Sequence, residues 1–381
     1  MKIIVFGAGL VGAPIAYDLA SAGEFEVSVA DKDVKALNKF AHSQEIQTIQ
    51  SDLSNPEIVK KLAKGFDFVI SAVPGHMGFQ TLKATIEAGK NVIDIAFFPE
   101  NLFDLDELAK ENGVTAISDI GVAPGFSNVL IGHVDHLLDK TLKAVIYVGG
   151  LPKIRKWPWE YKAVFSPIDV IEEYTRPARY IENGKMITKP ALSDPEFLDF
   201  PGIGTLEAFN SDGLRSLTHT IDCPNMIEKT LRYPGHIDKI KLLREVGFFN
   251  SNPVDMNGIE IKPIDFTAKL LFPKWKLEEG EEDITVMQVL IEGEKGKKKL
   301  RYTYDLYDSY DPIAKVHSMA RTTGYTASMA LRMVAKGLFK RKGVSAPEFI
   351  GKQPECVKFL LAGLKDRGVV YKERIEQLLT D

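Results

Sequence analysis

A glycine-rich turn near the start of the chain constrains the fold more than any other feature. Gly7-Ala8-Gly9-Leu10-Val11-Gly12 follows a β-branched run at 2–6 and opens an amphipathic stretch at 12–22. In a dinucleotide-binding turn the first glycine permits the bend, the second lets the backbone approach the pyrophosphate and the third allows close helix packing. The sequence therefore predicts an N-terminal dinucleotide-binding domain, the alternative being a tight turn without a ligand.

The residue that ends the second predicted strand supports a bound nucleotide. Asp31 lies 19 residues after Gly12, near the offset of about 20 at which a carboxylate binds the ribose hydroxyls. Because such a carboxylate repels a 2′-phosphate, NAD is favoured over NADP, although the neighbouring Lys32 keeps NADP open.

The first third of the chain alternates short β-branched runs with helical patterns, which predicts a doubly wound parallel sheet of the Rossmann type over 1–121. Strands are predicted at 2–6, 26–30, 46–50, 68–72, 91–95 and 115–118, and helices at 12–22, 32–41, 56–63, 78–88 and 104–112.

The remainder predicts a second domain of α+β type with a mixed or antiparallel sheet over 122–315, followed by helices over 316–381 that return to the first domain. Strand-like runs occupy 143–148, 265–271, 285–292 and 299–307, the last two forming a hairpin with the lysine-rich tract 293–298 at its tip. A long helix is predicted at 319–336, and a helical tail at 343–381.

Polar and turn residues follow several predicted strands of the first domain. Ligands of open α/β sheets bind outside the carboxyl ends of the strands. We therefore expect cofactor contacts at Asp52, Leu53 and the tripeptide Ala72-Val73-Pro74, although Asp52 can alternatively cap a helix. Asp94 and Asp119 end two further strands and are expected to border the nicotinamide, unless they hold loop amides.

Two segments of the second domain carry candidate chemistry. Arg215 lies in the polar loop 211–216, where a guanidinium can bind a substrate carboxylate through two parallel hydrogen bonds. His236 follows a Pro-Gly turn and begins a predicted helix, whose N-terminus disfavours the imidazolium and suits a neutral base. The alternatives are a surface arginine and a helix-capping or surface histidine.

Composition excludes several classes of protein. A net charge of −4 gives no basic surface for nucleic acid, and no apolar run approaches the length of a membrane span. The two cysteines, Cys223 and Cys356, have neither the number nor the spacing for a metal cluster or disulfide framework, and neither lies in a nucleophile motif. We expect a cytoplasmic protein that holds no metal.

Several segments together resemble the saccharopine dehydrogenase family, and within it the lysine 6-dehydrogenase-like proteins. The resemblance covers residues 1 to about 337 and is carried by these segments: GAGLVG from Gly7, SDIGVAPGFSN from Ser118, YVGGLP from Tyr147, EEYTRPAR from Glu172, EAFNSDGLRSL from Glu207, TLRYPGH from Thr230 and MARTTGYTA from Met319.

The resemblance implies an NAD(P)-dependent oxidoreductase that exchanges hydride at a carbon bearing nitrogen, and a homodimer. It assigns substrate contacts to Arg215 and to the segment that includes Arg232 and Tyr233. Asp119 is assigned to the nicotinamide side, and we add Asp94 as a substrate contact.

The first functional hypothesis is oxidative deamination of the L-lysine ε-amine to the semialdehyde, with His236 or Asp119 as base. A saccharopine-type reductase is the second hypothesis, in which Arg176, Arg179 or Arg232 binds further carboxylates. A non-catalytic NAD-binding protein is the third.

Overall fold

The chain forms two compact units in a computed structural model that describes residues 1–165, 167–278 and 280–379. The first unit comprises Met1–Asp139 and Ala320–Tyr371, and the second comprises Lys140–Met319 and Lys372–Asp381.

The first unit is built on seven parallel strands in the order β17-β6-β5-β4-β1-β2-β3. The chain places β2 on one side of β1 and β4 on the other, so the strand order reverses beside β1, where ligands of such sheets bind. This confirms the predicted doubly wound sheet. The strands are β1 (Lys2–Phe6), β2 (Glu26–Asp31), β3 (Ile46–Gln50), β4 (Phe68–Ser71), β5 (Asn91–Asp94), β6 (Thr115–Ile117) and β17 (Gly343–Ser345).

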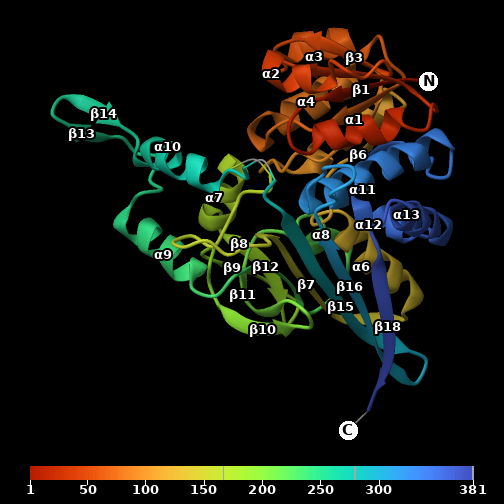
Figure 1. Cartoon of the computed structure of the whole chain (residues 1–381). Coiled ribbons are helices and arrows are strands. Elements are labelled where there is room, and N and C mark those ends of the chain that lie inside the picture. Colours follow the sequence, from red (N-terminus) through yellow and green to blue (C-terminus); the bar gives the residue numbers. More distant parts are fainter. Residues whose placement is uncertain (166, 279, 380–381) are drawn as a thin grey trace. The chain divides into compact units, whose positions relative to one another are not determined.

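Helices surround this sheet (Figure 1). Their starts follow local rules: α3 begins at Pro56, and the side chain of Asn55 accepts the N–H of Glu57 as an N-cap. The helices are α1 (Gly12–Ala20), α2 (Val34–Leu37), α3 (Pro56–Ala63), α4 (Gly75–Glu87), α5 (Asp106–Glu111), α6 (Phe126–Leu137), α11 (Ser318–Ala335, of which 320–335 lie in this unit), α12 (Pro347–Gly351) and α13 (Pro354–Asp366), with short 3₁₀ turns at Asn38–Phe40 and Leu102–Leu105.

The segment 122–139, assigned by its sequence to the second domain, packs within the first unit. A Cβ on Gly132 of α6 would lie 2.3 Å from the carbonyl oxygen of Glu348, and one on Gly351 would lie 2.2 Å from that of Val129. The two glycines therefore allow α6 and α12 to approach closely.

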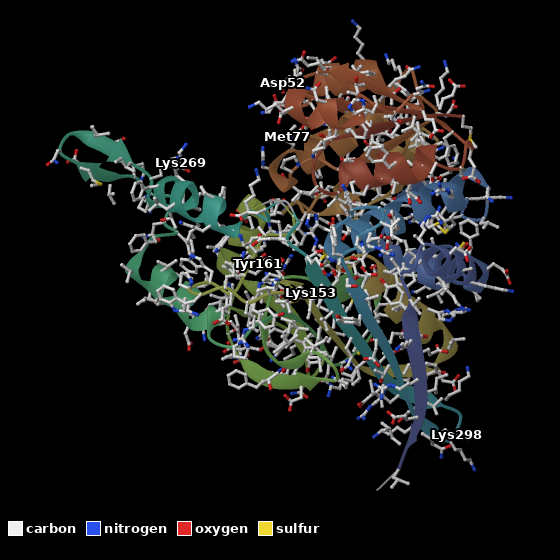
Figure 2. The ribbon with its side chains drawn as sticks, in the orientation of Figure 1. Asp52, Met77, Lys153, Tyr161, Lys269 and Lys298 are labelled. Carbon is white, nitrogen blue, oxygen red and sulfur yellow. The ribbon has the colours of Figure 1, made fainter. Side chains whose placement is uncertain are left out.

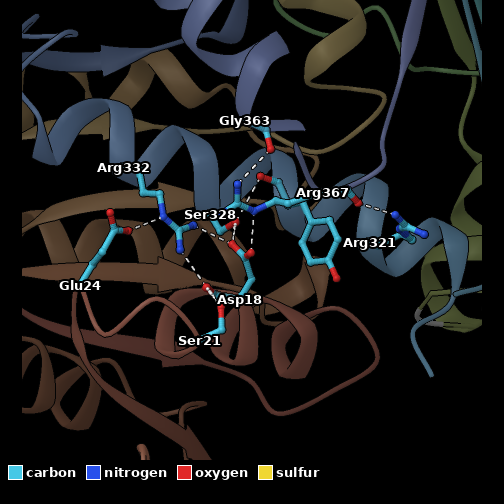
Figure 3. A network of polar contacts seen from close by, with 9 residues as sticks. Asp18, Ser21, Glu24, Arg321, Ser328, Arg332, Gly363 and Arg367 are labelled. Carbon is cyan, nitrogen blue, oxygen red and sulfur yellow. Dashed lines mark hydrogen bonds and ion pairs between the residues drawn. The ribbon is translucent and has the colours of Figure 1, made fainter. Parts of the chain in front are cut away.

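Asp18 of α1 is the centre of a polar network that joins α1 to α11 and α13 (Figure 3). Its carboxylate accepts from Arg332 Nη1 at 2.6 Å, Arg367 Nε at 2.6 Å and the Ser328 hydroxyl at 2.5 Å. Arg332 Nε also contacts Glu24 at 2.8 Å. Helices distant in the sequence are thus fixed to the helix that follows the glycine-rich turn.

The second unit contains a nine-stranded mixed sheet, in which β12 pairs in parallel with β7 and antiparallel with β11. This confirms the predicted mixed sheet. The strands are β7 (Lys140–Pro152), β8 (Ala178–Glu182), β9 (Lys185–Lys189), β10 (Glu196–Phe200), β11 (Gly204–Asn210), β12 (Met226–Arg232), β15 (Asp283–Lys295), β16 (Lys298–Ser309) and β18 (Tyr371–Leu378).

An aromatic core lies beside this sheet and includes Tyr161, Tyr174 and Trp275; Tyr161 is labelled in Figure 2. The remaining elements of the unit are α7 (Pro167–Thr175), α8 (Leu217–Thr220), α9 (His236–Val246), α10 (Pro263–Trp275) and the small hairpin of β13 (Val254–Met256) and β14 (Ile259–Ile261).

Two predictions of secondary structure are wrong. The run 265–271 lies in helix α10, where buried residues recur at 267, 268, 271 and 275 with helical rather than strand spacing. The tail 343–381 contains the predicted helices but also β17 and β18, which form by pairing with distant strands.

The predicted lysine-rich hairpin is present, with strands longer than expected. β15 and β16 remain paired up to Lys295 and Lys298 (Figure 2), so the turn contains only Gly296 and Lys297. Gly296 has a φ of +60°, as a two-residue hairpin turn requires. None of the helices within the described ranges has the length and apolar character to cross a membrane.

Candidate active site

The glycine-rich turn after β1 has the geometry that a pyrophosphate requires. A Cβ on Gly7, whose φ is +104°, would lie 2.5 Å from the carbonyl oxygen of Ala72, and one on Gly12 would lie 2.1 Å from that of Gly7. At Gly9 a Cβ would meet no heavy atom within 4 Å, so this side of the turn is open to a ligand. Helix α1 begins here without a side-chain cap, which suits an anion at its N-terminus. The residues present therefore fit a dinucleotide.

Asp31 holds this turn from the end of β2. Its Oδ2 accepts the N–H of Ala8 at 2.7 Å, and its Oδ1 accepts the N–H of Asp33 at 2.9 Å. Lys39 donates to the carbonyl oxygen of Ala8 at 3.3 Å. The carboxylate thus supports the backbone of the turn as well as standing where a ribose is expected. Three further cofactor contacts are predicted in this region: Leu10 and Lys32 are exposed, and Val11 is half-buried.

The strand-end residues after β3 and β4 differ in their surroundings. Asp52 accepts the N–H of Ser54 at 3.1 Å and its hydroxyl at 2.8 Å, and these bonds hold the pKa of Asp52 below its usual value. Asp52 does not cap α3, because Asn55 does. After β4, Ala72 packs against the glycine-rich turn, Val73 is buried and Pro74 is exposed as the N-cap of α4.

Asp94 and Asp119 lie close together in the first unit. Asp94 is fully buried at the end of β5, and its Oδ2 accepts the Ser118 hydroxyl at 2.8 Å. Burial, with a smaller contribution from the nearby charge of Asp119, raises the pKa of Asp94 to about 7 against the opposing effect of hydrogen bonds. Asp119 itself is buried and has a φ of +58°, which non-glycine residues rarely adopt. Asp94 can therefore exchange a proton near neutral pH.

Arg232 and His236 of the second unit are joined through Tyr174. Arg232 Nε donates to the Tyr174 hydroxyl at 3.0 Å, and this hydroxyl lies 2.9 Å from Nε2 of His236. Arg232 also binds Glu173 at 2.7 Å, and its guanidinium lies 4.5 Å from the ring centroid of Tyr161. The structure thus brings two of the predicted site residues into one buried network.

The surroundings of His236 differ from those of an exposed base. Its Nδ1 lies 2.8 Å from the carbonyl oxygen of Trp159, so Nδ1 carries the hydrogen and Nε2 accepts from Tyr174. The ring is 1% exposed, and burial, with the charge of Arg232, lowers the pKa of His236 to about 3. The imidazole is therefore neutral, as predicted for a helix start, but both nitrogens are occupied.

Arg215 is buried rather than lying on the surface. It is 8% exposed, has a φ of +54°, and its carbonyl oxygen accepts the Thr218 hydroxyl at 2.8 Å. Tyr233, the other predicted substrate contact of this unit, donates its hydroxyl to the carbonyl oxygen of Pro152 at 3.0 Å.

Sequence analysis named Arg232 but missed Glu228, Glu173 and Tyr174, which support this region. Glu228, Thr230 and Arg232 alternate along β12 and therefore share one face of the strand; all three are buried. Their alternation in the sequence could have indicated that they share one face of a strand. The burial of Glu228 could not be predicted in this way, because it depends on a loop that precedes the strand. Glu173 and Tyr174 lie in a segment that already carried the family resemblance. Groups of three or more metal-binding side chains are absent from the described part of the chain.

A doubly wound sheet with this turn, joined to a second unit rich in buried charged groups, defines an oxidoreductase that uses a nicotinamide dinucleotide. The chain belongs to the saccharopine dehydrogenase family: residues 3–117 match the saccharopine dehydrogenase NADP binding domain, and residues 121–369 match the saccharopine dehydrogenase C-terminal domain.

Curated relatives agree with this family. The chain is 24% identical to the NADP⁺-dependent, L-glutamate-forming saccharopine dehydrogenase of Saccharomyces cerevisiae, over 98% of this chain and 99% of that protein. It is 25% identical to carboxyaminopropylagmatine dehydrogenase of a Synechocystis species, over 97% and 98%. The solved apo structure of the yeast saccharopine dehydrogenase has the same fold, with a TM-score of 0.80 and 20% identity over 98% of this chain and 99% of that chain.

Proposed function

We propose that the protein is an amino-acid dehydrogenase that oxidises the ε-amine of L-lysine, or of a related basic amino acid, to the semialdehyde. Membership of the family supports the redox chemistry, and the pairing of the arginines in the second unit supports the substrate.

The observation that carries this proposal is that three arginines of the second unit are each paired with an acidic side chain. Arg232 binds Glu173 at 2.7 Å, and Arg179 binds Asp212 through two bonds of 2.8 Å. Arg176 contacts Glu172 at 3.3 Å. A substrate with several carboxylates would have to displace one of these acids from its arginine, which favours an amino acid with a single carboxylate.

The proposed chemistry requires a cofactor, a cation that binds the substrate carboxylate and a proton acceptor. When bound, a nicotinamide dinucleotide would supply the hydride acceptor, and Gly7, Gly9 and Gly12 would hold its pyrophosphate. Arg215 binds the substrate carboxylate and so orients the side chain. A proton acceptor keeps the amine neutral, because an ammonium has no lone pair to expel the hydride. Asp119 is the stronger candidate for this role, since both nitrogens of His236 are occupied and its pKa is lowered to about 3. Water then hydrolyses the imine of the substrate to aldehyde and ammonia.

A saccharopine-type reaction is the second candidate, favoured by the names of the relatives. The yeast relative is a saccharopine dehydrogenase and the Synechocystis relative acts on carboxyaminopropylagmatine, by their names. In this candidate the chain acts on the C–N bond that joins two metabolites, and one arginine leaves its acidic partner to bind a further carboxylate.

A substrate panel tests both candidates. The purified chain is assayed with L-lysine, L-ornithine and saccharopine in the presence of NAD⁺ or NADP⁺, and with glutamate plus aminoadipate semialdehyde in the presence of NADH or NADPH. Absorbance of the reduced nicotinamide is followed in each assay. Cofactor reduction by L-lysine alone, with release of ammonia, is the expected result. Turnover confined to saccharopine, or to glutamate with the semialdehyde, would contradict lysine deamination and support the second candidate.

A further inference from the structure

The loop that carries Arg215 rests on a buried carboxyl group of β12. Oε2 of Glu228 accepts the Ser211 hydroxyl at 2.7 Å and the N–H of Gly213 at 3.1 Å. A Cβ on Gly213 would lie 2.4 Å from Cδ of Glu228. The backbone of the loop 211–216 therefore lies directly on the carboxyl group, and a side chain at 213 would displace that group.

The conformation of Arg215 needs this support. A non-glycine residue with a φ of +54° is strained and persists where its surroundings enforce it. Asp212 is fixed by two bonds from Arg179, and Thr218 binds the carbonyl oxygen of Arg215. Glu228 fixes the remaining side of the loop, since it binds the residues on either side of Asp212.

The charges around Glu228 explain why a carboxyl group serves here. Two acidic groups act on it, Glu173 of α7 and Asp212 of the loop, and each is paired with a cation, Arg232 and Arg179 respectively. Glu228 is 4% exposed; burial raises its pKa to about 8, and the two acids add to the rise. A neutral carboxyl holds the loop without competing with a substrate carboxylate for the guanidinium.

We propose that Glu228 is a positioning residue that sets the affinity for the substrate carboxylate by holding the loop 211–216 in the conformation that presents Arg215. This inference rests on the proposed role of Arg215 as the carboxylate-binding residue.

Kinetics of Glu228→Ala and Glu228→Gln test the proposal. Glu228→Ala should raise KM for L-lysine about tenfold, the equivalent of one lost hydrogen bond, with a smaller change in kcat and no change in cofactor affinity. Glu228→Gln, which keeps a neutral acceptor, should restore KM. Binding of 1,5-diaminopentane, which is lysine without its carboxylate, should be unaffected, measured as competitive inhibition.

Two controls separate positioning from general stability. Glu196→Gln removes a carboxylate that pairs with Lys229 on the opposite face of β12, and should leave KM unchanged. In the unaltered chain KM for lysine should rise as the pH passes about 8 and Glu228 ionises, and Glu228→Gln should abolish this rise.

Amide hydrogen exchange gives a readout that needs no turnover. Glu228→Ala should speed exchange across 211–216 and leave α9 unchanged, and Ser211→Ala gives a milder test if the first variant does not fold. A folded Glu228→Ala chain with unchanged exchange and unchanged lysine KM would overturn the proposal. Absence of lysine turnover by the unaltered chain would instead contradict the proposed function, and the exchange measurement would still decide the role of Glu228.

Discussion

Asp31 and the named relatives favour different cofactors. The matched N-terminal family model and the yeast relative are named for NADP, whereas a carboxylate at the end of β2 repels a 2′-phosphate. In this chain both oxygens of Asp31 accept backbone N–H groups of Ala8 and Asp33, which keeps the charge fixed beside the turn.

Asp31→Asn is therefore expected to raise the ratio of kcat/KM for NADP to that for NAD about tenfold, or about 1.4 kcal/mol. The amide oxygen still accepts one backbone N–H, so the turn is retained while the charge is removed. Steady-state kinetics with both cofactors provide the measurement. Asp33→Asn is the matched control, because Asp33 caps α2. An equal change of the kcat/KM ratio in both variants would show that Asp31 does not discriminate between the two cofactors at the ribose.

His236 offers a prediction that separates a base from a positioning residue. Because its two nitrogens bind Tyr174 and the carbonyl oxygen of Trp159, His236→Ala removes the acceptor of the Tyr174 hydroxyl proton and the side-chain donor to that carbonyl oxygen. We expect it to lower the free energy of unfolding by about 1–3 kcal/mol and to spare cofactor affinity, both measurable in the same preparation. If the variant instead keeps its stability and loses turnover, and if the acid limb of the pH–rate profile is lost with it, His236 is the base.

At the scale of elements, α1 depends on charges contributed by two distant helices. Asp18 is shared by Arg332, Arg367 and Ser328 (Figure 3), so its removal leaves two guanidinium groups without their common acceptor. Asp18→Ala should reduce the free energy of unfolding by about 3–5 kcal/mol, measured by urea denaturation. Glu24→Gln is the matched control, because Glu24 contacts the same Arg332 but is 37% exposed, and should cost less than about 1 kcal/mol. Equal losses would contradict a buried centre at Asp18.

The elements that sequence predicted well are those specified by local signals. Strands β1 to β6 carry β-branched runs followed by turns or by helix starts, and the helix at His236 follows a Pro-Gly turn. Strand β17 has three residues and exists because it pairs with β6, more than 200 positions earlier in the chain. No local pattern encodes such a pairing, and the same holds for β18.

The candidate site was predictable to a similar degree. The glycine-rich turn and the position of Asp31 follow from spacing, and Asp94 and Asp119 lie together because β5 and β6 are neighbours. By contrast, the burial of Glu228 under the loop 211–216 and the link from Arg232 through Tyr174 to His236 arise from tertiary packing. The sequence therefore allowed candidate residues of this region to be predicted, but not the side chains that they contact.

At the scale of the whole molecule, buried titratable groups have opposite effects on how the free energy of unfolding depends on pH. The pKa of Asp94 is raised to about 7 and that of Glu228 to about 8, chiefly by burial, while burial lowers that of His236 to about 3. The unfolded chain releases protons from the two acids at lower pH than the native chain does. Their contribution to stability is therefore complete below pH 4 and is lost as the pH rises to about 8. The contribution of His236 is present above pH 6.5 and is lost on acidification.

Between pH 6.5 and 8 the two acids act without opposition from His236, so the free energy of unfolding should fall by about 2–3 kcal/mol, at about 1.4 kcal/mol per pKa unit. Chemical denaturation at intervals from pH 6 to 9 measures this fall, and the double variant Asp94→Asn with Glu228→Gln should flatten it. Glu281→Gln is the control: despite partial burial, hydrogen bonds from Lys156 and Lys162 hold the pKa of Glu281 at about 2, so this variant should alter stability below pH 5 and retain the decline above pH 6.5. A decline that persists in the double variant would show that other groups limit the stability of the chain in alkali.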